Sequence, residues 1–379
     1  MIVDAHSHIA SPEAAARYPM PASLRDPGAM IEGKLGLGVT TSVVGSPSGA
    51  GPMVPMPGAA EASRDPDALS RLHDWFAEMV TTYPENLRAL VWVHAFATDR
   101  ELARAAETYR AGPFAGFMVN SSVDGSYLDS PRADSFFDMV DECDAPVVMH
   151  APAAPAAGTG IGDLRLLEQL GRFCDVTVGL SACLLSGRFE RHPKLRLLAT
   201  AGGGALALAV ERLDDAWHAV HWTAGRPPSG SQPSARPQPN GARPQPSARP
   251  QPNGARQPDG ARQPNGGRPP NGARQPSARP PASPLPAAAA LPKAPSQYLS
   301  QVWVDTATPS RRALEANLDL LGPGHVLFGT DSPPLDGTSA QYLRMIAELP
   351  DESHKERILT KNAEEFFALR PLNAAARPA

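Results

Sequence analysis

The chain has 379 residues, with 42% hydrophobic side chains, 20% charged side chains and a formal net charge of −4, as is usual for a folded protein. No window approaches the roughly 20 consecutive apolar residues of a membrane span, and the start MIVDAHSHIA lacks the basic and apolar segments of a signal peptide. We therefore expect a cytoplasmic protein that does not enter a membrane and whose cysteines, Cys143, Cys174 and Cys183, are reduced.

Short β-branched or apolar runs alternate with helical stretches along the chain. Strands are predicted at 2–4, 40–44, 89–93, 116–119, 146–149, 195–199, 301–305 and 325–329. Helical patterns lie at 69–84, 101–110, 132–143, 163–173, 205–220 and 311–321. Eight strands with helices between them predict an α/β fold, a (β/α)8 TIM barrel with its chemistry at the carboxyl ends of the strands.

Residues 226–292, between the sixth helix and the seventh strand, differ in composition from the rest. They contain 19 of the 43 prolines and nine arginines against the single Asp259, with no aromatic residue. A segment of this kind cannot build a core, so we expect a disordered, low-complexity insertion of net charge +8 in one barrel domain formed by 1–225 and 293–379. A tandem expansion in a tolerant loop is the simpler interpretation. The alternative is a basic tether for an acidic partner, and the lack of aromatic residues argues against nucleic-acid binding.

Four residues of metal-ligating type stand at the ends of predicted strands. His6 and His8 follow the first strand, His150 ends the fifth and Asp331 follows the eighth. Residues two apart in a strand point to the same face, so His6 and His8 can both project into the barrel mouth. Three imidazoles and one carboxylate suit one Zn²⁺, with Mn²⁺ and Fe²⁺ as alternatives.

Several segments occur in the order found in a known family. They are VDAHSHIA, LRALVWVHAF, GFMVNSSVDGSYLDSP, APVVMHAP, HPKLRLLATAGGGALALAVERLD, VWVDTAT and VLFGTDSPP. The chain resembles the amidohydrolase-related family that includes aminocarboxymuconate-semialdehyde decarboxylase and other metal-dependent decarboxylases and hydrolases. The resemblance implies one metal ion held by His6, His8, His150 and Asp331, and a homodimer with active sites near its interface. It also places Arg226 roughly where the family has an arginine that binds a substrate carboxylate.

One position departs from the family pattern. Relatives usually read HGGGA after the sixth strand, and that histidine assists the metal-bound water, whereas this chain has Ala201 before Gly202, Gly203 and Gly204. Alanine exchanges no proton, so a base worth about 10²–10⁴-fold in rate is missing. Asp331, which could hold the metal and also shuttle a proton, and His94, at the end of the third strand, are the candidate replacements. His94 could equally be a hydrogen-bonded core histidine.

Other polar residues near strand ends have two interpretations each. Asn120, with Ser121 and Ser122, could contact a small-molecule substrate or cap the next helix. Asp4 could orient a ligand imidazole or make a structural hydrogen bond within its strand. The three glycines could bind an anion, but a tight turn explains them more simply.

These residues support competing hypotheses about function. The first is a metal-dependent enzyme that hydrolyses or non-oxidatively decarboxylates a small carboxylated or cyclic substrate, with elimination or isomerisation as a third chemistry. The second is a non-catalytic relative that keeps the metal for stability or ligand binding, which Ala201 motivates. The third is the tether described above.

Overall fold

The computed structural model describes residues 1–217, 291–333 and 336–369. Nearly all of the predicted insertion, Arg226 included, lies outside them. Eight parallel strands form one sheet in the order β1-β2-β3-β4-β7-β8-β9-β10. Their bounds are β1 (Ile2–His8), β2 (Val39–Gly45), β3 (Leu87–Val93), β4 (Phe114–Asn120), β7 (Val147–His150), β8 (Leu197–Ala199), β9 (Val302–Asp305) and β10 (Val326–Leu327).

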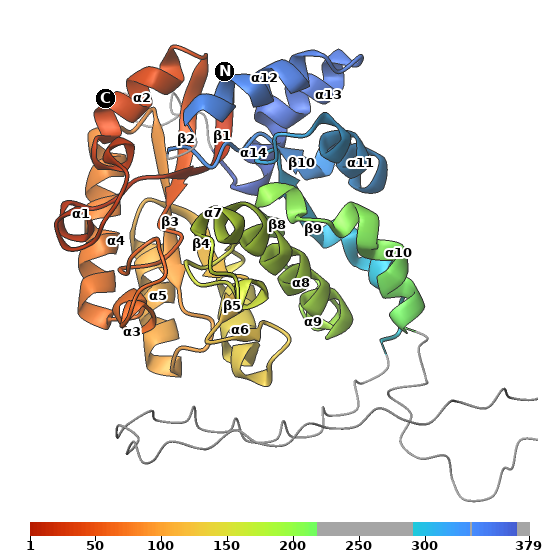
Figure 1. Ribbon diagram of the computed structural model, residues 1–379, viewed down its shortest axis with the longest axis horizontal. Helices are drawn as coiled ribbons and strands as arrows, with labels where there is room; N and C mark the ends of the chain where they lie inside the picture. Colours follow the sequence, from red (N-terminus) through yellow and green to blue (C-terminus); the bar gives the residue numbers. More distant parts are fainter. Residues whose placement is uncertain (218–290, 334–335, 370–379) are drawn as a thin grey trace, which may run out of the picture. The chain divides into compact units, whose positions relative to one another are not determined.

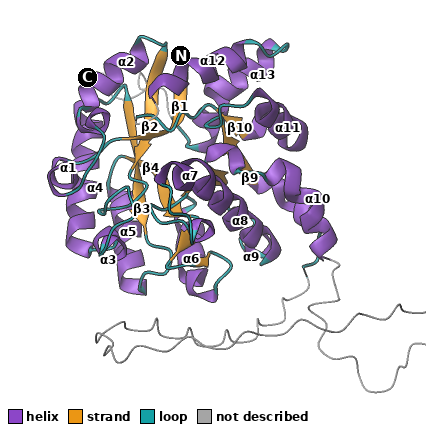
Figure 2. Cartoon of the chain, in the orientation of Figure 1, coloured by secondary structure: helices purple, strands orange, loops and turns teal. Residues whose placement is uncertain are grey.

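The sheet curves until its first and last strands meet. The Ala5 amide donates to the Phe328 carbonyl at 2.8 Å, and Ser7 bridges Ser332 in the parallel sense. Helices surround the strands on the outside, as Figure 2 shows. The predicted (β/α)8 TIM barrel is therefore confirmed.

The helices lie between successive strands along the chain, except for α12, α13 and α14, which follow β10 (Figure 1). They are α1 (Pro12–Arg17), α2 (Pro27–Leu35), α3 (Ala59–Ser63), α4 (Pro66–Thr82), α5 (Asp99–Ala111), α6 (Asp134–Cys143), α7 (Leu164–Leu166), α8 (Arg172–Leu185), α9 (Arg188–Arg191), α10 (Leu206–Trp217), α11 (Arg311–Leu321), α12 (Ser339–Ala347), α13 (Glu352–Glu356) and α14 (Asn362–Phe366). Two π-helical segments, η4 (Leu167–Gly171) and η9 (Arg357–Lys361), adjoin α8 and α14. The 3-10 turns are η1 (Ala22–Arg25), η2 (Pro131–Ala133), η3 (Ala156–Gly158), η5 (Ala201–Gly203), η6 (Pro295–Gln301), η7 (Pro323–His325) and η8 (Asp336–Thr338).

Local sequence explains where the two helices beside β3 begin. Asp65 precedes α4 and accepts hydrogen bonds from two free backbone amides of its first turn, and Pro66 occupies a first-turn position that needs no amide proton. Thr98 and Glu101 form a reciprocal capping box at the start of α5. Both helices pack an apolar face on the barrel.

The barrel interior is filled below the mouth. Buried side chains from seven of the strands share one cluster, which contains Val3, Val43, Leu90, Met118, Val148, Leu198 and Leu327. Polar side chains begin only above this layer, at the carboxyl ends of the strands. Truncating Leu90, Met118, Leu198 or Leu327 of this cluster to alanine should cost about 2–5 kcal/mol, because the surrounding shell cannot fully collapse.

Differences from the predicted elements are local. The eighth predicted strand is reduced to Val326–Leu327, and the sixth begins at Leu197. A short hairpin, β5 (Ser122–Val123) with β6 (Ser126–Tyr127), follows β4 and was not predicted. Its strands are too short to give a recognisable alternation of side chains.

Two further sequence expectations concern the membrane and the cysteines. Within the described ranges, no helix combines the length and the apolar character needed to cross a bilayer. Cys143, Cys174 and Cys183 are all free thiols.

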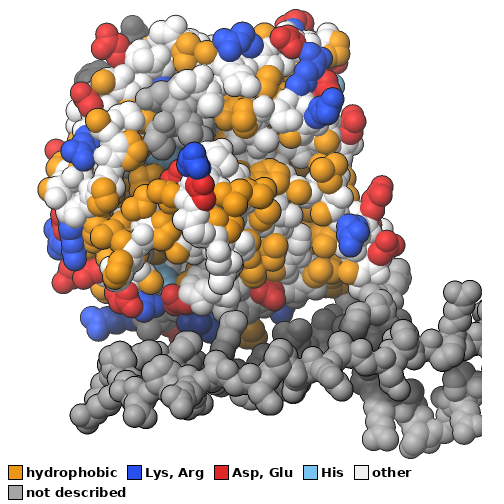
Figure 3. Space-filling model, in the orientation of Figure 1, with side chains coloured by type: hydrophobic (Ala, Val, Ile, Leu, Met, Phe, Trp, Pro, Cys, Tyr) orange, Lys and Arg blue, Asp and Glu red, His pale blue; other side chains and the backbone are white. Residues whose placement is uncertain are grey.

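The face drawn in Figure 3 carries its apolar side chains near the centre and its charged side chains mostly at the edges. Among the exposed large apolar residues are Leu164, Leu166 and Leu170, from α7 and η4.

Candidate metal centre

Four side chains from three separate parts of the barrel meet at its mouth. His6 and His8 come from β1, His150 ends β7 and Asp331 follows β10. One ligand atom from each lies within 4.8 Å of every other. The three imidazole rings stand nearly edge to face, with centroids 4.9–5.1 Å apart. The four residues predicted as metal ligands are thus brought together.

Each imidazole is oriented by a hydrogen bond at its Nδ1 atom. His6 Nδ1 lies 2.6 Å from Asp305 Oδ2, His8 Nδ1 lies 2.9 Å from the Gly45 carbonyl and His150 Nδ1 lies 2.7 Å from the Ala151 carbonyl. All three partners accept hydrogen bonds, which places the proton on Nδ1 and leaves the Nε2 lone pair directed toward the cluster.

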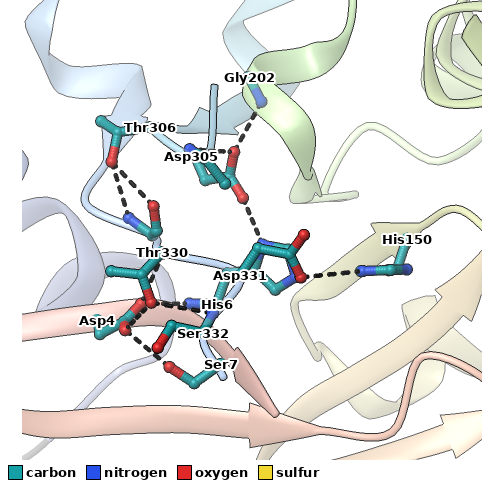
Figure 4. Close-up of polar contacts among 12 residues, drawn as sticks. Asp4, His6, Ser7, His150, Gly202, Asp305, Thr306, Thr330, Asp331 and Ser332 are labelled. Carbon is teal, nitrogen blue, oxygen red and sulfur yellow. Dashed lines mark hydrogen bonds and ion pairs between the residues drawn. The ribbon is translucent and has the colours of Figure 1, made fainter. Parts of the chain in front are cut away.

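The donor set fits a divalent cation. His6 Nε2 lies 3.1 Å from His8 Nε2, an arrangement of two lone pairs that needs a cation or a proton between them. Asp331 Oδ1 lies 2.8 Å from His8 Nε2 and 3.8 Å from His150 Nε2 (Figure 4). An ion at zinc distances would separate its ligands by about 3.4 Å, which falls within the spread of these distances.

Burial and charge set the protonation of the cluster. Burial lowers the pKa of His150 to about 4, so its imidazole is neutral at pH 7. Burial also acts to lower the pKa of His6, but the hydrogen bond to Asp305 and the nearby charge of Asp331 raise it above its usual value. For Asp331, burial acts to raise the pKa, but the interaction with His150 and the charge of His6 outweigh it, so the pKa lies well below its usual value. Without an ion, the Asp331 carboxylate therefore favours a proton on His6 and leaves His150 neutral.

Asp305, the last residue of β9, joins the metal cluster to the turn that contains Ala201. Its Oδ2 atom holds His6, and its Oδ1 atom accepts the amide of Gly202 at 2.7 Å (Figure 4). Ala201 itself has φ +53°, a region that alanine rarely occupies, and the three glycines that follow have φ of +62° to +69°. The glycines therefore serve the tight turn, as the simpler interpretation held. Ala201 directly precedes Gly202, whose amide donates to Asp305, the carboxylate that orients the His6 imidazole.

Asp4 has a structural role rather than the imidazole-orienting role that the sequence suggested first. Its Oδ1 atom accepts the backbone amides of His6 and Thr330, both at 3.1 Å. Its Oδ2 atom accepts the Lys34 ammonium and the Ser7 and Thr330 hydroxyls. This buried network ties α2 and the chain after β10 to β1, below the metal ligands.

His94 and Asn120 do not join the cluster. The charged groups that act on His94 are Asp124, Arg64, Arg132 and Glu101, and burial lowers its pKa. Asn120 ends β4 and donates from its amide nitrogen to the Pro47 carbonyl at 2.8 Å and the His150 carbonyl at 3.3 Å. Since both amide protons have backbone partners, only the amide oxygen is left for a substrate.

The hydroxyls of Ser121 and Ser122 are engaged within the protein, and that of Ser122 accepts the amide of Ala156, the first residue of η3, at 3.2 Å. Both hydroxyls donate to the buried carboxylate of Asp175 on α8, at 2.5 and 3.1 Å.

Asp305 and Lys34 support the site but were not predicted from the sequence. Asp305 lies 299 positions from His6, and no local pattern links the two. The available signal was that Asp305 ends a barrel strand, as His150 does. Lys34 had no such signal, because its place on α2 resembles that of any lysine near a helix end.

Comparisons with known proteins place the chain among amidohydrolases. A family model described as amidohydrolase matches residues 3–246 and 266–369. The 2-amino-3-carboxymuconate-6-semialdehyde decarboxylase of Dictyostelium discoideum is 21% identical over 307 residues, which are 80% of this chain and 67% of that protein.

Solved structures with the same fold include two decarboxylases. The 5-carboxyvanillate decarboxylase of Novosphingobium aromaticivorans, with bound manganese and 3-methoxy-4-hydroxy-5-nitrobenzoic acid, aligns with TM-score 0.68 and 17% identity over 97% of each chain. A 2,6-dihydroxybenzoate decarboxylase in complex with 2,6-dihydroxybenzoate aligns with TM-score 0.63 and 17% identity over 97% of this chain and 98% of that one.

Proposed function

Because the chain belongs to the amidohydrolase family, we propose that it is a metal-dependent enzyme that decarboxylates a small carboxylated aromatic or cyclic substrate without oxidation. The observation that carries the proposal is the cluster of three oriented histidines and one carboxylate at the barrel mouth. The activities of the relatives named above favour decarboxylation over hydrolysis.

His6, His8, His150 and Asp331 would hold the ion. When bound, a divalent cation would polarise a substrate oxygen and so draw electron density from the carbon that bears the carboxylate. Three nitrogen donors and one oxygen donor suit zinc, and the manganese bound by 5-carboxyvanillate decarboxylase makes Mn²⁺ the second ion to test.

The missing histidine at position 201 also favours decarboxylation. Hydrolysis needs a base that takes a proton from the attacking water and returns it to the leaving group, which is the role the missing histidine would have had. In decarboxylation the C–C bond breaks, CO₂ leaves, the electron pair stays on the substrate carbon, and that carbon takes one proton. A site with a single group able to pass on a proton can therefore serve this reaction.

We assign that proton transfer to Asp331. Its side chain is 32% exposed, whereas those of His6 and His150 are 1% and 8% exposed, so Asp331 is the group of these three that an entering substrate reaches most easily. It would take a proton from solvent or from a substrate hydroxyl and deliver it to the carbon. His94 is the second candidate for a proton-transferring residue, and the oxygen of Asn120 could contact the substrate.

The test is CO₂ release by the full-length protein loaded with Zn²⁺ or Mn²⁺. The substrates are hydroxybenzoic acids with a hydroxyl group beside the carboxylate and, separately, esters and amides of the same acids. We expect CO₂ from the acids and none from protein carrying His150→Ala. Cleavage of the esters or amides alone would replace the proposal with hydrolysis. Bound metal without turnover on any of them would favour the non-catalytic alternative.

We also infer a homodimer, as the family resemblance implies. Leu166 and Leu170, one helical turn apart on α7 and η4, are 47% and 48% exposed, and contiguous exposed apolar surface marks interaction sites on soluble proteins. Light scattering should give twice the mass of the chain, and Leu166→Glu should shift the protein toward the monomer. A monomer at micromolar concentration would contradict this inference.

A further inference from the structure

One buried carboxylate outside the metal cluster binds two of the segments that follow barrel strands. Asp175, in the first turn of α8, is fully buried. It accepts hydrogen bonds from the hydroxyls of Ser121 and Ser122, at 2.5 and 3.1 Å, from the phenol of Tyr127 at 3.2 Å and from the amide of Ala157 at 3.0 Å. The first three donors follow β4 and the last lies in η3, after β7. Asp175 therefore joins the ends of two neighbouring strands to α8.

The hydrogen-bond partners of Asp175 in the described part of the chain are all neutral groups. A buried carboxylate is unfavourable unless hydrogen bonds satisfy its oxygens. Burial and the charge of Asp175 raise the pKa of Tyr127 above its usual value, so the phenol keeps the proton that it donates. Because the carboxylate depends on these donors, it restricts the movement of both segments.

The helix α8 meets the same backbone a second time, one turn further on. Gly179 lies four residues after Asp175 and therefore on the same face of the helix. A Cβ atom at Gly179 would stand 2.9 Å from the Cβ atom and 2.9 Å from the carbonyl oxygen of Ser121. Only glycine allows so close an approach, so Ser121 is held by both Asp175 and Gly179.

Ser121 connects this contact to the metal cluster. Its backbone amide donates to the carbonyl of His150 at 2.8 Å, and the side chain of Asn120 donates to the same carbonyl at 3.3 Å. Asp175 also holds η3, which follows His150 along the chain. The main chain of one candidate metal ligand is thus fixed on both sides by segments that Asp175 binds.

We propose that Asp175 is a positioning residue of the metal centre, which acts through Ser121 and η3 to fix the main chain of His150. The inference rests on the proposed metal centre but not on the reaction catalysed there. A functional site of this kind needs its ligands held within about 0.5 Å of the binding geometry. A small movement of the segment after β4 should therefore weaken the binding of the ion.

The Zn²⁺ affinity of the full-length protein, measured by competition with a chromogenic chelator, tests this role. Asp175→Ala removes every acceptor contact of the side chain and should raise the dissociation constant of Zn²⁺ roughly 10-fold, the lower end of the range for residues that orient metal ligands. Asp175→Asn keeps the shape and one acceptor oxygen, so it should restore most of the affinity, to within about 3-fold of the unmodified protein.

Gly179→Ala disturbs the same backbone without changing any charge. The added Cβ would lie 2.9 Å from that of Ser121, and an ordinary carbon–carbon contact is about 3.5 Å, so the two must separate by about 0.6 Å. This variant should also weaken Zn²⁺ binding roughly 10-fold. If Asp175→Ala does not fold, Gly179→Ala and Asp175→Asn still decide.

Leu184→Ala is the matched control for lost stability. Leu184 is fully buried on α8, nine residues beyond Asp175 and so about 14 Å further along the helix axis. Its truncation should lower the melting temperature but leave the Zn²⁺ affinity within about 2-fold. The visible spectrum of the Co²⁺-loaded protein is a second readout, because it reports the geometry of the ligands. It should change with Asp175→Ala and Gly179→Ala and stay the same with Leu184→Ala.

Two outcomes would overturn this inference alone. Unchanged Zn²⁺ affinity and Co²⁺ spectrum in folded Asp175→Ala or Gly179→Ala would leave Asp175 with a purely structural role. An equal loss of affinity in Leu184→Ala would show that metal binding follows overall stability rather than the position of Ser121. Absence of Zn²⁺ binding by the unmodified protein would instead contradict the metal centre itself, and this inference with it.

Discussion

Replacing Asp305 by asparagine should weaken metal binding although Asp305 is not a ligand. Asp305 Oδ1 accepts two backbone amides, from Gly202 at 2.7 Å and from Ala307 at 3.1 Å, so the amide oxygen of Asp305→Asn must stay on that side. Its NH₂ group would then face His6 Nδ1, where Oδ2 now stands at 2.6 Å. To accept from it, His6 must move its proton to Nε2, the atom that faces His8 and the metal position.

The expected loss follows from that change of tautomer. Removing a partner that orients a ligand imidazole typically costs 10–100-fold in metal affinity, or about 1.4–2.7 kcal/mol. The pKa of His6 should also fall in the metal-free variant, because burial would no longer be opposed by the Asp305 carboxylate.

Competition with a chromogenic chelator at pH 7 would measure the metal affinity. Asp319→Asn, an exposed substitution on α11, is the control for the loss of one carboxylate. A folded Asp305→Asn protein that binds Zn²⁺ within about 2-fold of the unmodified chain would refute the reasoning, since the hydrogen bond would then have no influence on the ligand.

Three further predictions follow from single positions. Ala201→His should be tolerated, because φ at this position is +53°, a region where histidine is found more often than alanine. The substitution should raise hydrolysis of esters by about 10²-fold while changing CO₂ release only a few-fold. Equal gains in both assays would contradict the assigned chemistry. Asp331→Asn should lower turnover by at least about 10²-fold even when saturating metal restores binding, and full recovery would exclude Asp331 from proton transfer. Burial lowers the pKa of His73 from 6.5 to about 4. As the pH falls, His73 is therefore protonated in the unfolded chain before it is protonated in the folded one. The free energy of unfolding should drop by roughly 2–3 kcal/mol between pH 6.5 and 4.5. In denaturant titrations at these pH values, His73→Gln should show a smaller drop, and the same drop would contradict the assignment.

The barrel was predictable from the sequence because its strands are short apolar runs bounded by polar strand ends. The helix at 69–84 was predicted from the spacing of Leu72, Phe76 and other apolar residues, and α4 spans Pro66–Thr82, so the prediction begins three residues late and ends two residues late. The short hairpin after β4 and the two π-helical segments were not predicted, because each is defined by only a few backbone hydrogen bonds that no side-chain period marks.

The convergence of the four candidate metal ligands was predictable for a topological reason. The carboxyl ends of all strands meet at one end of a barrel, so His6, His8, His150 and Asp331 had to converge if the strands were placed correctly. Their orientation was not predictable, because it depends on the carbonyls of Gly45 and Ala151 and on a carboxylate from a distant strand. His94 shows the limit of the argument: a strand-end position alone did not bring it into the cluster.

The most direct test of the metal centre is the metal content of the full-length protein purified without chelators. Elemental analysis should find about one zinc, manganese or iron ion per chain in the unmodified protein, and almost none in His150→Ala, since the neutral imidazole of His150 would be one of four ligands. Absence of metal from the unmodified protein even after supplementation with Zn²⁺ and Mn²⁺, or equal metal content in the two proteins, would contradict the account.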